Sequence, residues 1–200
     1  MKAFILTILI CLNVNISDAQ SEHILKVLFR YGSRPASGYE KTEFDDFGGI
    51  HGGHVCLGID SIVIGFDSPV GFHIFPRKKK LKGVFVRENE VDYMQDTIKK
   101  KYAIVEIPIT EEQYVKLQNI FSGYLNYTPY DYAFFGMRCA SATYDILSQI
   151  GIVEQKSRVG IIISNFYPKL FRRKVFRLAK ENKYKVTKLK GRKTREWEDD

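Results

Sequence analysis

Residues 53–67 read GHVCLGIDSIVIGFD, and this segment determines the architecture that we expect for the whole chain. Two short apolar runs, residues 54–59 and 62–66, lie on either side of the polar pair Asp60-Ser61. This pattern is typical of two antiparallel strands that are joined by a two-residue turn. The segment therefore predicts a β-hairpin in which Ile59 lies opposite Ile62.

The register of this hairpin brings polar side chains together at its open end. Counting back from the turn along both strands sets His54 opposite Asp67. Directly paired residues share a face of the sheet, with their β-carbons about 5 Å apart. A carboxylate in that position can accept a hydrogen bond from the imidazole and hold it in one orientation. The same register puts Cys56 on the His54 face, and a slip of one residue would move Asp67 to the other face.

Strands are predicted on both sides of the hairpin from their content of apolar and β-branched residues. Between the first of these strands and the hairpin, residues 32–53 are rich in Gly, Ser, Pro and Asp, which predicts a loop. The additional strands are expected at residues 23–31, 71–75, 83–87, 102–109 and 184–189.

Three helices are predicted in the second half of the chain. Thr110 and Gln113 fit a capping box at the start of the first helix. The second helix should run from residue 139 to 150 and end at Gly151. The third covers residues 168–181, with Asn165 nearby as an N-cap. Strands followed by helices predict an α+β fold with an antiparallel sheet packed against helices.

Cys139 stands at the start of the second predicted helix, which is the chemical setting of a reactive thiol. A helix N-terminus and a nearby imidazole both lower the pKa of a thiol, and the positive charge of Arg138 acts in the same direction. We therefore take Cys139 as the candidate nucleophile and His54 as the candidate base, with His51 as the alternative base. Asp67 is the candidate orienting group, and His73 is its alternative.

Two cysteines, Cys56 and Cys139, lie beyond residue 19. In an oxidising compartment they could instead form one disulfide, which would remove the nucleophile. The histidines do not have the spacing of paired metal ligands, so we expect neither a metal nor another cofactor.

The N-terminal residues have the features of a secretory signal peptide. Met1-Lys2 gives a positive start, residues 3–11 are apolar and uncharged, and Ser17 and Ala19 are the small residues that precede a cleavage site. The apolar run is shorter than the roughly 18 residues of a membrane-spanning helix. We expect residues 1–19 to be a signal peptide, residues 20–200 to form a single domain, and the protein to be secreted or periplasmic.

The formal net charge of +8 is unevenly distributed along the chain. Residues Lys169–Arg195 hold thirteen of the 31 basic residues and one acid, Glu181, and a second basic cluster covers Arg77–Lys82. Such clusters favour an anionic partner, here a membrane surface or an acidic wall polymer, although they also occur as plain solvated surfaces. For a secreted protein we expect no nucleic-acid partner.

Residues 50–152 resemble the circularly permuted NlpC-type papain-like cysteine hydrolases, which include YiiX-like bacterial proteins and, more distantly, lecithin retinol acyltransferase-like enzymes. In that family the histidine strand precedes the cysteine helix, the reverse of papain. The matching segments, in chain order, are Gly53-His54-Val55, the strand and helix start Val105–Tyr114, the aromatic residues Tyr130, Tyr132 and Phe135, Arg138-Cys139-Ala140-Ser141, Leu147 and Gly151-Ile152.

The resemblance implies a papain-like domain with a basic C-terminal helix and strand as an extension. It implies that Cys139 is the nucleophile and His54 the base, with Asp67 the polar residue on the second hairpin strand. The implied activity is hydrolysis of an amide or ester bond through an acyl-enzyme, with cell-wall peptide as the substrate. A membrane-surface thiol acyltransferase or lipase, and a non-catalytic binding module on the same fold, are the alternatives. Many members have Asn immediately before the cysteine, where this chain has Arg138.

Overall fold

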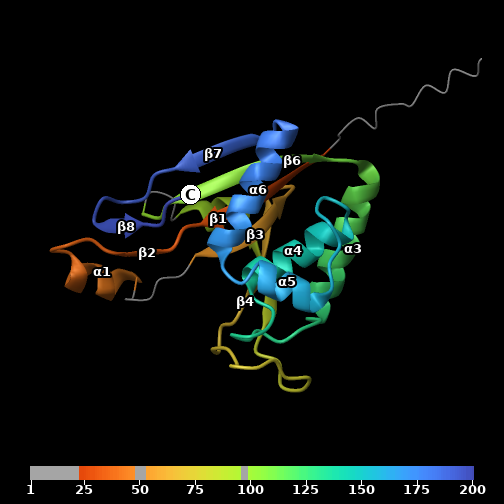
Figure 1. The fold of residues 1–200 in the computed structure, drawn as a ribbon, viewed down its shortest axis with the longest axis horizontal. Helices are drawn as coiled ribbons and strands as arrows, with labels where there is room; N and C mark the ends of the chain where they lie inside the picture. The colour runs from red at the N-terminus through yellow and green to blue at the C-terminus, as the bar shows by residue number, and fades with distance from the viewer. Residues whose placement is uncertain (1–22, 48–52, 96–98) are drawn as a thin grey trace, which may run out of the picture.

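The structure is a computed structural model that describes residues 23–47, 53–95 and 99–200. Within these residues the protein is α+β, with a six-stranded antiparallel sheet and six helices. The strands of the sheet lie in the order β5 (Val84–Asn89), β4 (Ile62–Asp67), β3 (His54–Ile59), β1 (His23–Arg30), β6 (Tyr102–Ile109) and β7 (Lys185–Leu189) (Figure 1). A separate two-stranded sheet pairs β2 (Ser33–Pro35) with β8 (Arg195–Trp197).

The β3–β4 hairpin has the predicted register. Ile59 pairs with Ile62, and Cys56 pairs with Gly65. Asp60 and Ser61 form the turn with φ angles of 49° and 66°. Positive φ at both central residues is the geometry that matches the twist of a two-residue hairpin, and a short polar side chain such as that of Asp tolerates it.

Side chains of β3 alternate between the two faces of the sheet, and the two faces carry apolar clusters of different size. Val55, Leu57 and Ile59 belong to the main apolar core, which lies between the sheet and four helices. These helices are α3 (Glu111–Asn126), α4 (Cys139–Gln149), α5 (Arg158–Ser164) and α6 (Pro168–Asn182). Cys56 points to the opposite face, because successive side chains of a strand alternate.

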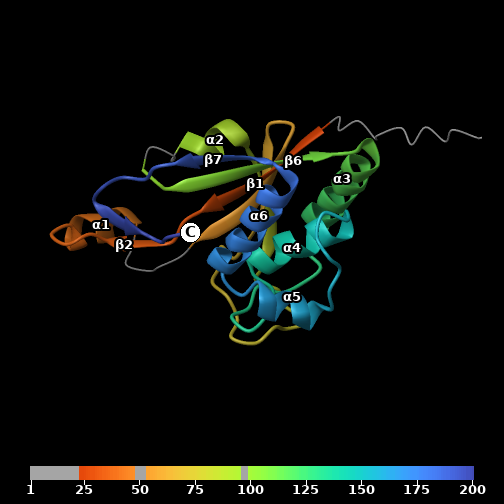
Figure 2. The same cartoon turned by 45° about the horizontal axis from the view of Figure 1, so that its top comes forward.

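The opposite face of the sheet carries a smaller apolar cluster made by Leu28, Cys56 and Val63. The short helix α2 (Glu90–Met94) covers this cluster through Tyr93 and Met94. Figure 2 shows α2 on the side of the sheet away from α4 and α6. The last helix, α1 (Glu40–Phe47), lies beside β2 and β8 at one end of the molecule.

Most of the predicted elements are present, because their signals are local. The capping box at the start of α3 is confirmed: the Gln113 amide donates to the Thr110 hydroxyl at 3.3 Å, and the Thr110 amide donates to the Gln113 side chain at 3.0 Å. Helix α4 begins at Cys139, and Gly151 follows it with a φ of 77°, which favours glycine.

Other expectations were wrong. Residues 32–53 do not form one loop, since they contain β2 and α1. Residues 71–75 form no strand, and only His73 makes an isolated bridge, to Ala133. Helices α2 and α5 were not predicted. Asn165 ends α5, and Tyr167 is the N-cap of α6.

The C-terminal helix and strand are integrated with the rest of the chain. Strand β7 pairs with β6 at the edge of the large sheet, and α6 packs on the main core through Phe171 and Val175. The proposed signal peptide, residues 1–19, lies outside the described residues. None of the helices described is long and apolar enough to cross a membrane.

Candidate active site

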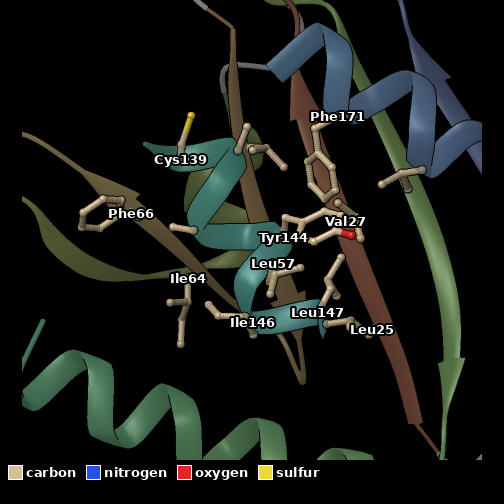
Figure 3. Packing of buried hydrophobic residues seen from close by; sticks show 14 of the residues in the cluster. Leu25, Val27, Leu57, Ile64, Phe66, Cys139, Tyr144, Ile146, Leu147 and Phe171 are labelled. Atoms are coloured by element: carbon tan, nitrogen blue, oxygen red, sulfur yellow. The ribbon is translucent and has the colours of Figure 1, made fainter. Parts of the chain in front are cut away.

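Cys139 is the first residue of α4, at the end of the helix that carries free backbone amides. The first turn is closed by a hydrogen bond from the Ala142 amide to the Arg138 carbonyl at 2.8 Å. The Ser141 hydroxyl accepts a hydrogen bond from the Arg138 amide at 2.7 Å. Figure 3 shows the sulfur of Cys139 turned away from the apolar residues Ile146 and Leu147, which point toward the strands. The helix is therefore anchored by its apolar side, and the buried thiol lies at its first turn.

His54 is the first residue of β3 and is buried together with Cys139. The two side chains interact by charge and by hydrogen bonding. Burial by itself would raise the pKa of the Cys139 thiol, but His54, the Val55 amide and Arg138 together lower it below its ordinary value of 9.0. The structure thus brings together the predicted nucleophile and the predicted base.

The pKa of His54 shifts in the complementary direction. Burial lowers it, whereas the neighbouring sulfurs of Cys56 and Cys139 raise it, and the net result lies well above 6.5. The two shifts have opposite directions, and both favour the charged form of the group concerned.

Asp67 lies where the hairpin register predicts. One of its carboxylate oxygens is 3.6 Å from Nε2 of His54, which is an ion-pair distance and longer than a hydrogen bond. The Asp67 side chain is 44% exposed. Gly65 leaves room for the ring, because a β-carbon at this position would be 3.1 Å from Nε2 of His54 and 2.7 Å from Sγ of Cys56.

His73 does not orient His54, and the alternative that gave it this role was wrong. Its Nδ1 is 2.6 Å from a carboxylate oxygen of Asp131. The same carboxylate accepts hydrogen bonds from the amides of Arg77 and Lys82 at 2.9 Å and 2.8 Å. His73 therefore fixes a loop rather than a catalytic imidazole. His51, the alternative base, lies outside the described residues.

Cys56 and Cys139 are both free, so the alternative disulfide is not formed. The disulfide required α4 to pack on the Cys56 face of the hairpin, but α4 packs on the opposite face with Val55 and Leu57. The Cys56 thiol instead lies 3.4 Å from the Tyr93 hydroxyl.

Tyr132 is a site residue to which the sequence analysis gave no chemical role. Burial and the charge of Cys139 raise the pKa of the Tyr132 hydroxyl, which also hydrogen bonds with the Cys139 side chain. The Tyr132 hydroxyl therefore interacts with both the backbone and the side chain of the first residue of α4. The only sequence signal was the position of Tyr132 in the aromatic segment before the cysteine.

A polar cavity of about 180 Å³ lies beside His54 and Asp67. Its other walls come from β1, β5, α2, the start of β6 and a residue just before β6. They are formed by Arg30, Glu88, Asp92, Tyr93, Lys100 and Tyr102. The His54 imidazole and the Asp67 carboxylate therefore border this polar cavity, whereas Cys139 is not among the residues that line it. Across the described ranges, no group of three His, Cys, Asp or Glu side chains could hold a metal ion.

Comparison of the chain with protein-family models, with curated proteins and with solved structures gave no match.

Proposed function

We propose that this protein is a papain-like thiol hydrolase that cleaves an amide or ester bond through an acyl-enzyme on Cys139. One observation carries the proposal: the thiol at the start of α4 interacts with the buried imidazole at the start of β3. The order of the two elements, with the histidine strand before the cysteine helix, supports the permuted form of the papain-like fold.

The proposed reaction has two steps. The Cys139 thiolate attacks the carbonyl carbon, and the protonated His54 gives its proton to the departing amine or alcohol. Neutral His54 then takes a proton from water, whose oxygen attacks the acyl group, and the acid leaves as the thiolate and imidazolium are restored. In this proposal the Cys139 backbone amide and the Tyr132 hydroxyl donate to the oxyanion of both tetrahedral intermediates.

The substrate class follows from the acyl chemistry and from the expected location. For a secreted or periplasmic hydrolase of this kind, a cell-wall peptide is the first substrate to test. A thiol acyltransferase or lipase at a membrane surface is the second candidate, in which an acceptor other than water takes the acyl group. The exposed and stacked rings of Phe75 and Phe135, the latter four residues before Cys139, favour this candidate.

Alkylation by iodoacetamide at pH 6 tests the site without knowledge of the substrate. In a Cys56→Ala background, Cys139 should be labelled much faster than an ordinary thiol, and intact-mass measurement should show one adduct. His54→Ala should slow this labelling, whereas His23→Ala, which changes a surface histidine paired with Glu111, should not. A Cys139 thiol that reacts no faster than free cysteine would favour the non-catalytic binding module.

Hydrolysis itself can be followed with a panel of acyl probes. Peptide amides taken from cell-wall stems and short-chain thioesters or esters represent the two substrate classes. Cys139→Ser should abolish turnover of whichever probe is cleaved, and an acyl adduct of Cys139 should appear by mass spectrometry. Turnover that persists in Cys139→Ser would remove Cys139 from the mechanism.

A further inference from the structure

Bulky apolar side chains are exposed on the connection between β4 and β5. Phe72, Ile74 and Phe75 in this connection, and Phe135 just before α4, are each more than half exposed. The rings of Phe75 and Phe135 stack with their centroids 5.3 Å apart, so the two segments form one surface. A contiguous apolar patch of this kind marks an interaction site, whereas scattered single exposed residues are normal.

The segment that carries this patch is held firmly. Its His73 is bonded to the buried Asp131, and the amides of Phe134 and Phe135 donate to the carbonyls of His73 and Ile74 at 2.7 Å and 2.9 Å. Figures 1 and 2 show the β4–β5 connection beside the chain that leads into α4. The apolar side chains are therefore presented to solvent by a fixed backbone.

A row of cations adjoins the apolar patch. Arg77, Lys78, Lys79 and Lys80 are all exposed, and in the described part of the chain no carboxylate forms an ion pair with them. Their positive charge is thus available to an anionic partner. We call Phe72, Ile74, Phe75, Phe135 and Arg77–Lys80 the docking surface.

Several cations of the longer basic run, Lys169–Arg195, form ion pairs within the molecule. Arg172 pairs with the acidic C-terminal residues, Lys185 pairs with Glu106, and Arg195 pairs with the buried Glu43. These pairs join α6 to the C-terminal residues, β7 to β6, and β8 to α1. In the docking surface, by contrast, four consecutive exposed cations adjoin a group of exposed aromatic and aliphatic side chains.

Arg138 connects the docking surface to the nucleophile. Its guanidinium lies over the rings of Phe134, Phe166 and Tyr167, with centroid distances of 5.6 Å, 4.7 Å and 5.4 Å. The ring of Phe134 in turn contacts that of Phe135, at 4.8 Å. Because Arg138 directly precedes Cys139, a partner on the docking surface would be close to the thiol.

We propose that the docking surface binds the face of an anionic lipid bilayer. Aromatic and aliphatic side chains that enter the interface, together with lysines that meet anionic headgroups, are the combination that such binding requires. A soluble acidic polymer would match the cations but would leave the exposed apolar side chains in water. The proposal does not depend on hydrolysis, since docking requires neither Cys139 nor His54.

Vesicle co-sedimentation tests the proposal with the full chain. The protein should bind vesicles of phosphatidylcholine and phosphatidylglycerol, bind phosphatidylcholine alone much more weakly, and dissociate as salt is raised. Lys78→Gln with Lys79→Gln should weaken binding by roughly fivefold for each charge. Phe75→Ser should weaken it by roughly tenfold, because a ring no longer enters the interface.

Two matched controls make the outcome specific. Lys169→Gln with Lys180→Gln removes the same charge from the C-terminal run, and Val115→Ser removes an exposed apolar side chain from α3. Neither should weaken binding by more than twofold. Circular dichroism and iodoacetamide labelling of Cys139 should be unchanged in every variant, which separates docking from folding and from the proposed chemistry.

Three results would overturn the proposal. The first is no binding to anionic vesicles. The second is a greater loss of binding in the Lys169 and Lys180 variant than in the loop variants. The third is binding that survives Phe75→Ser but is fully displaced by a soluble acidic polymer, which would identify the surface as a polyanion site.

Discussion

Nε2 of His54 lies 3.6 Å from a carboxylate oxygen of Asp67, across the open end of the β3–β4 hairpin. The contact joins the first residue of one strand to the last residue of the next, so it depends on the register of the whole hairpin. The carboxylate is partly exposed, and it can therefore orient the imidazole but is screened by water.

Asp67→Asn should lower kcat/KM for a cleaved acyl probe by about tenfold, because the imidazole loses charge stabilisation but keeps its position at the start of β3. The rates of hydrolysis by the Asp67→Asn variant and the wild-type protein measure this. Asp60→Asn, at the turn of the same hairpin, is the control and should be silent. A loss of a thousandfold would mean that Asp67 is a closer partner than its exposure indicates.

The pH dependence of thiol alkylation should report the thiolate–imidazolium pair. Because His54 and Arg138 lower the pKa of Cys139, the thiolate persists below pH 9 and is lost as pH falls through the lowered value. In His54→Ala the midpoint should move upward, and labelling at pH 7 should slow by about tenfold, because a smaller fraction of the thiol is ionised. Rates of iodoacetamide labelling between pH 5 and 10, in the Cys56→Ala background, give both midpoints.

Arg138→Gln should shift the same midpoint upward by less than His54→Ala, because Arg138 acts on the thiol through charge alone whereas His54 also hydrogen bonds with it. Lys116→Gln, an exposed lysine on α3, serves as the comparison and should leave the midpoint unchanged. An equal shift in both variants would mean that net charge, rather than the position of Arg138, sets the reactivity.

Asp131→Asn should lower the free energy of unfolding by about 3 kcal/mol near neutral pH, since the buried carboxylate accepts two backbone hydrogen bonds and binds His73. Burial raises the pKa of Asp131, but the Lys82 and Arg77 amides and His73 outweigh it and hold the pKa below 3.8. The stabilisation is therefore complete above the unfolded pKa and disappears as pH falls through the folded one.

Denaturant unfolding of the Asp131→Asn variant and the wild-type protein at pH 3 and pH 7 tests whether the stabilisation by Asp131 decreases as pH falls. The two curves should differ clearly at pH 7 and approach each other at pH 3. If the difference stayed constant or grew toward low pH, the carboxylate would not be the charged acceptor that the structure shows.

Arg172 is fully buried, lies 3.7 Å from the ring centroid of Tyr31, and pairs with Glu198 and Asp200 at 3.6 Å and 3.4 Å. Removal of residues 198–200 should destabilise the fold by about 3–5 kcal/mol, because it leaves a buried positive charge without its partners. Arg172→Met in the truncated chain should restore part of this loss. Thermal unfolding of the wild-type chain, the truncated chain, Arg172→Met and the truncated Arg172→Met variant measures the coupling between Arg172 and the C-terminal carboxylates. Additive changes in the free energy of unfolding would contradict this coupling.

Several parts of the site could be predicted from local sequence. The hairpin and its register follow from the apolar runs and the two-residue turn, so the hairpin segment by itself assigns Asp67 to the His54 face. The start of α4 at Cys139 follows from its apolar periodicity, and the start of α3 follows from its capping box. In each case the residues that specify the feature are close together in the chain, and the backbone conformation depends on them directly.

The contacts that depend on distant segments could not be predicted. His73 was a candidate partner of His54, but its ring reaches Asp131, 58 positions along the chain. Residues 33–35 read as loop because the strand that pairs with them lies at residues 195–197.

The amino-acid sequence alone therefore determined the strands of the hairpin, the helix that begins at Cys139 and the shared face of His54 and Asp67. Only the tertiary structure decided that α4 packs on the face opposite Cys56 and that several cations of the basic C-terminal run form ion pairs within the molecule. The physical reason is that the hydrophobic periodicity of a strand or helix and the capping of a helix are set by residues close together in the chain. The face of the sheet on which a helix packs, and the partner of each charged side chain, depend on how the whole chain buries its apolar surface.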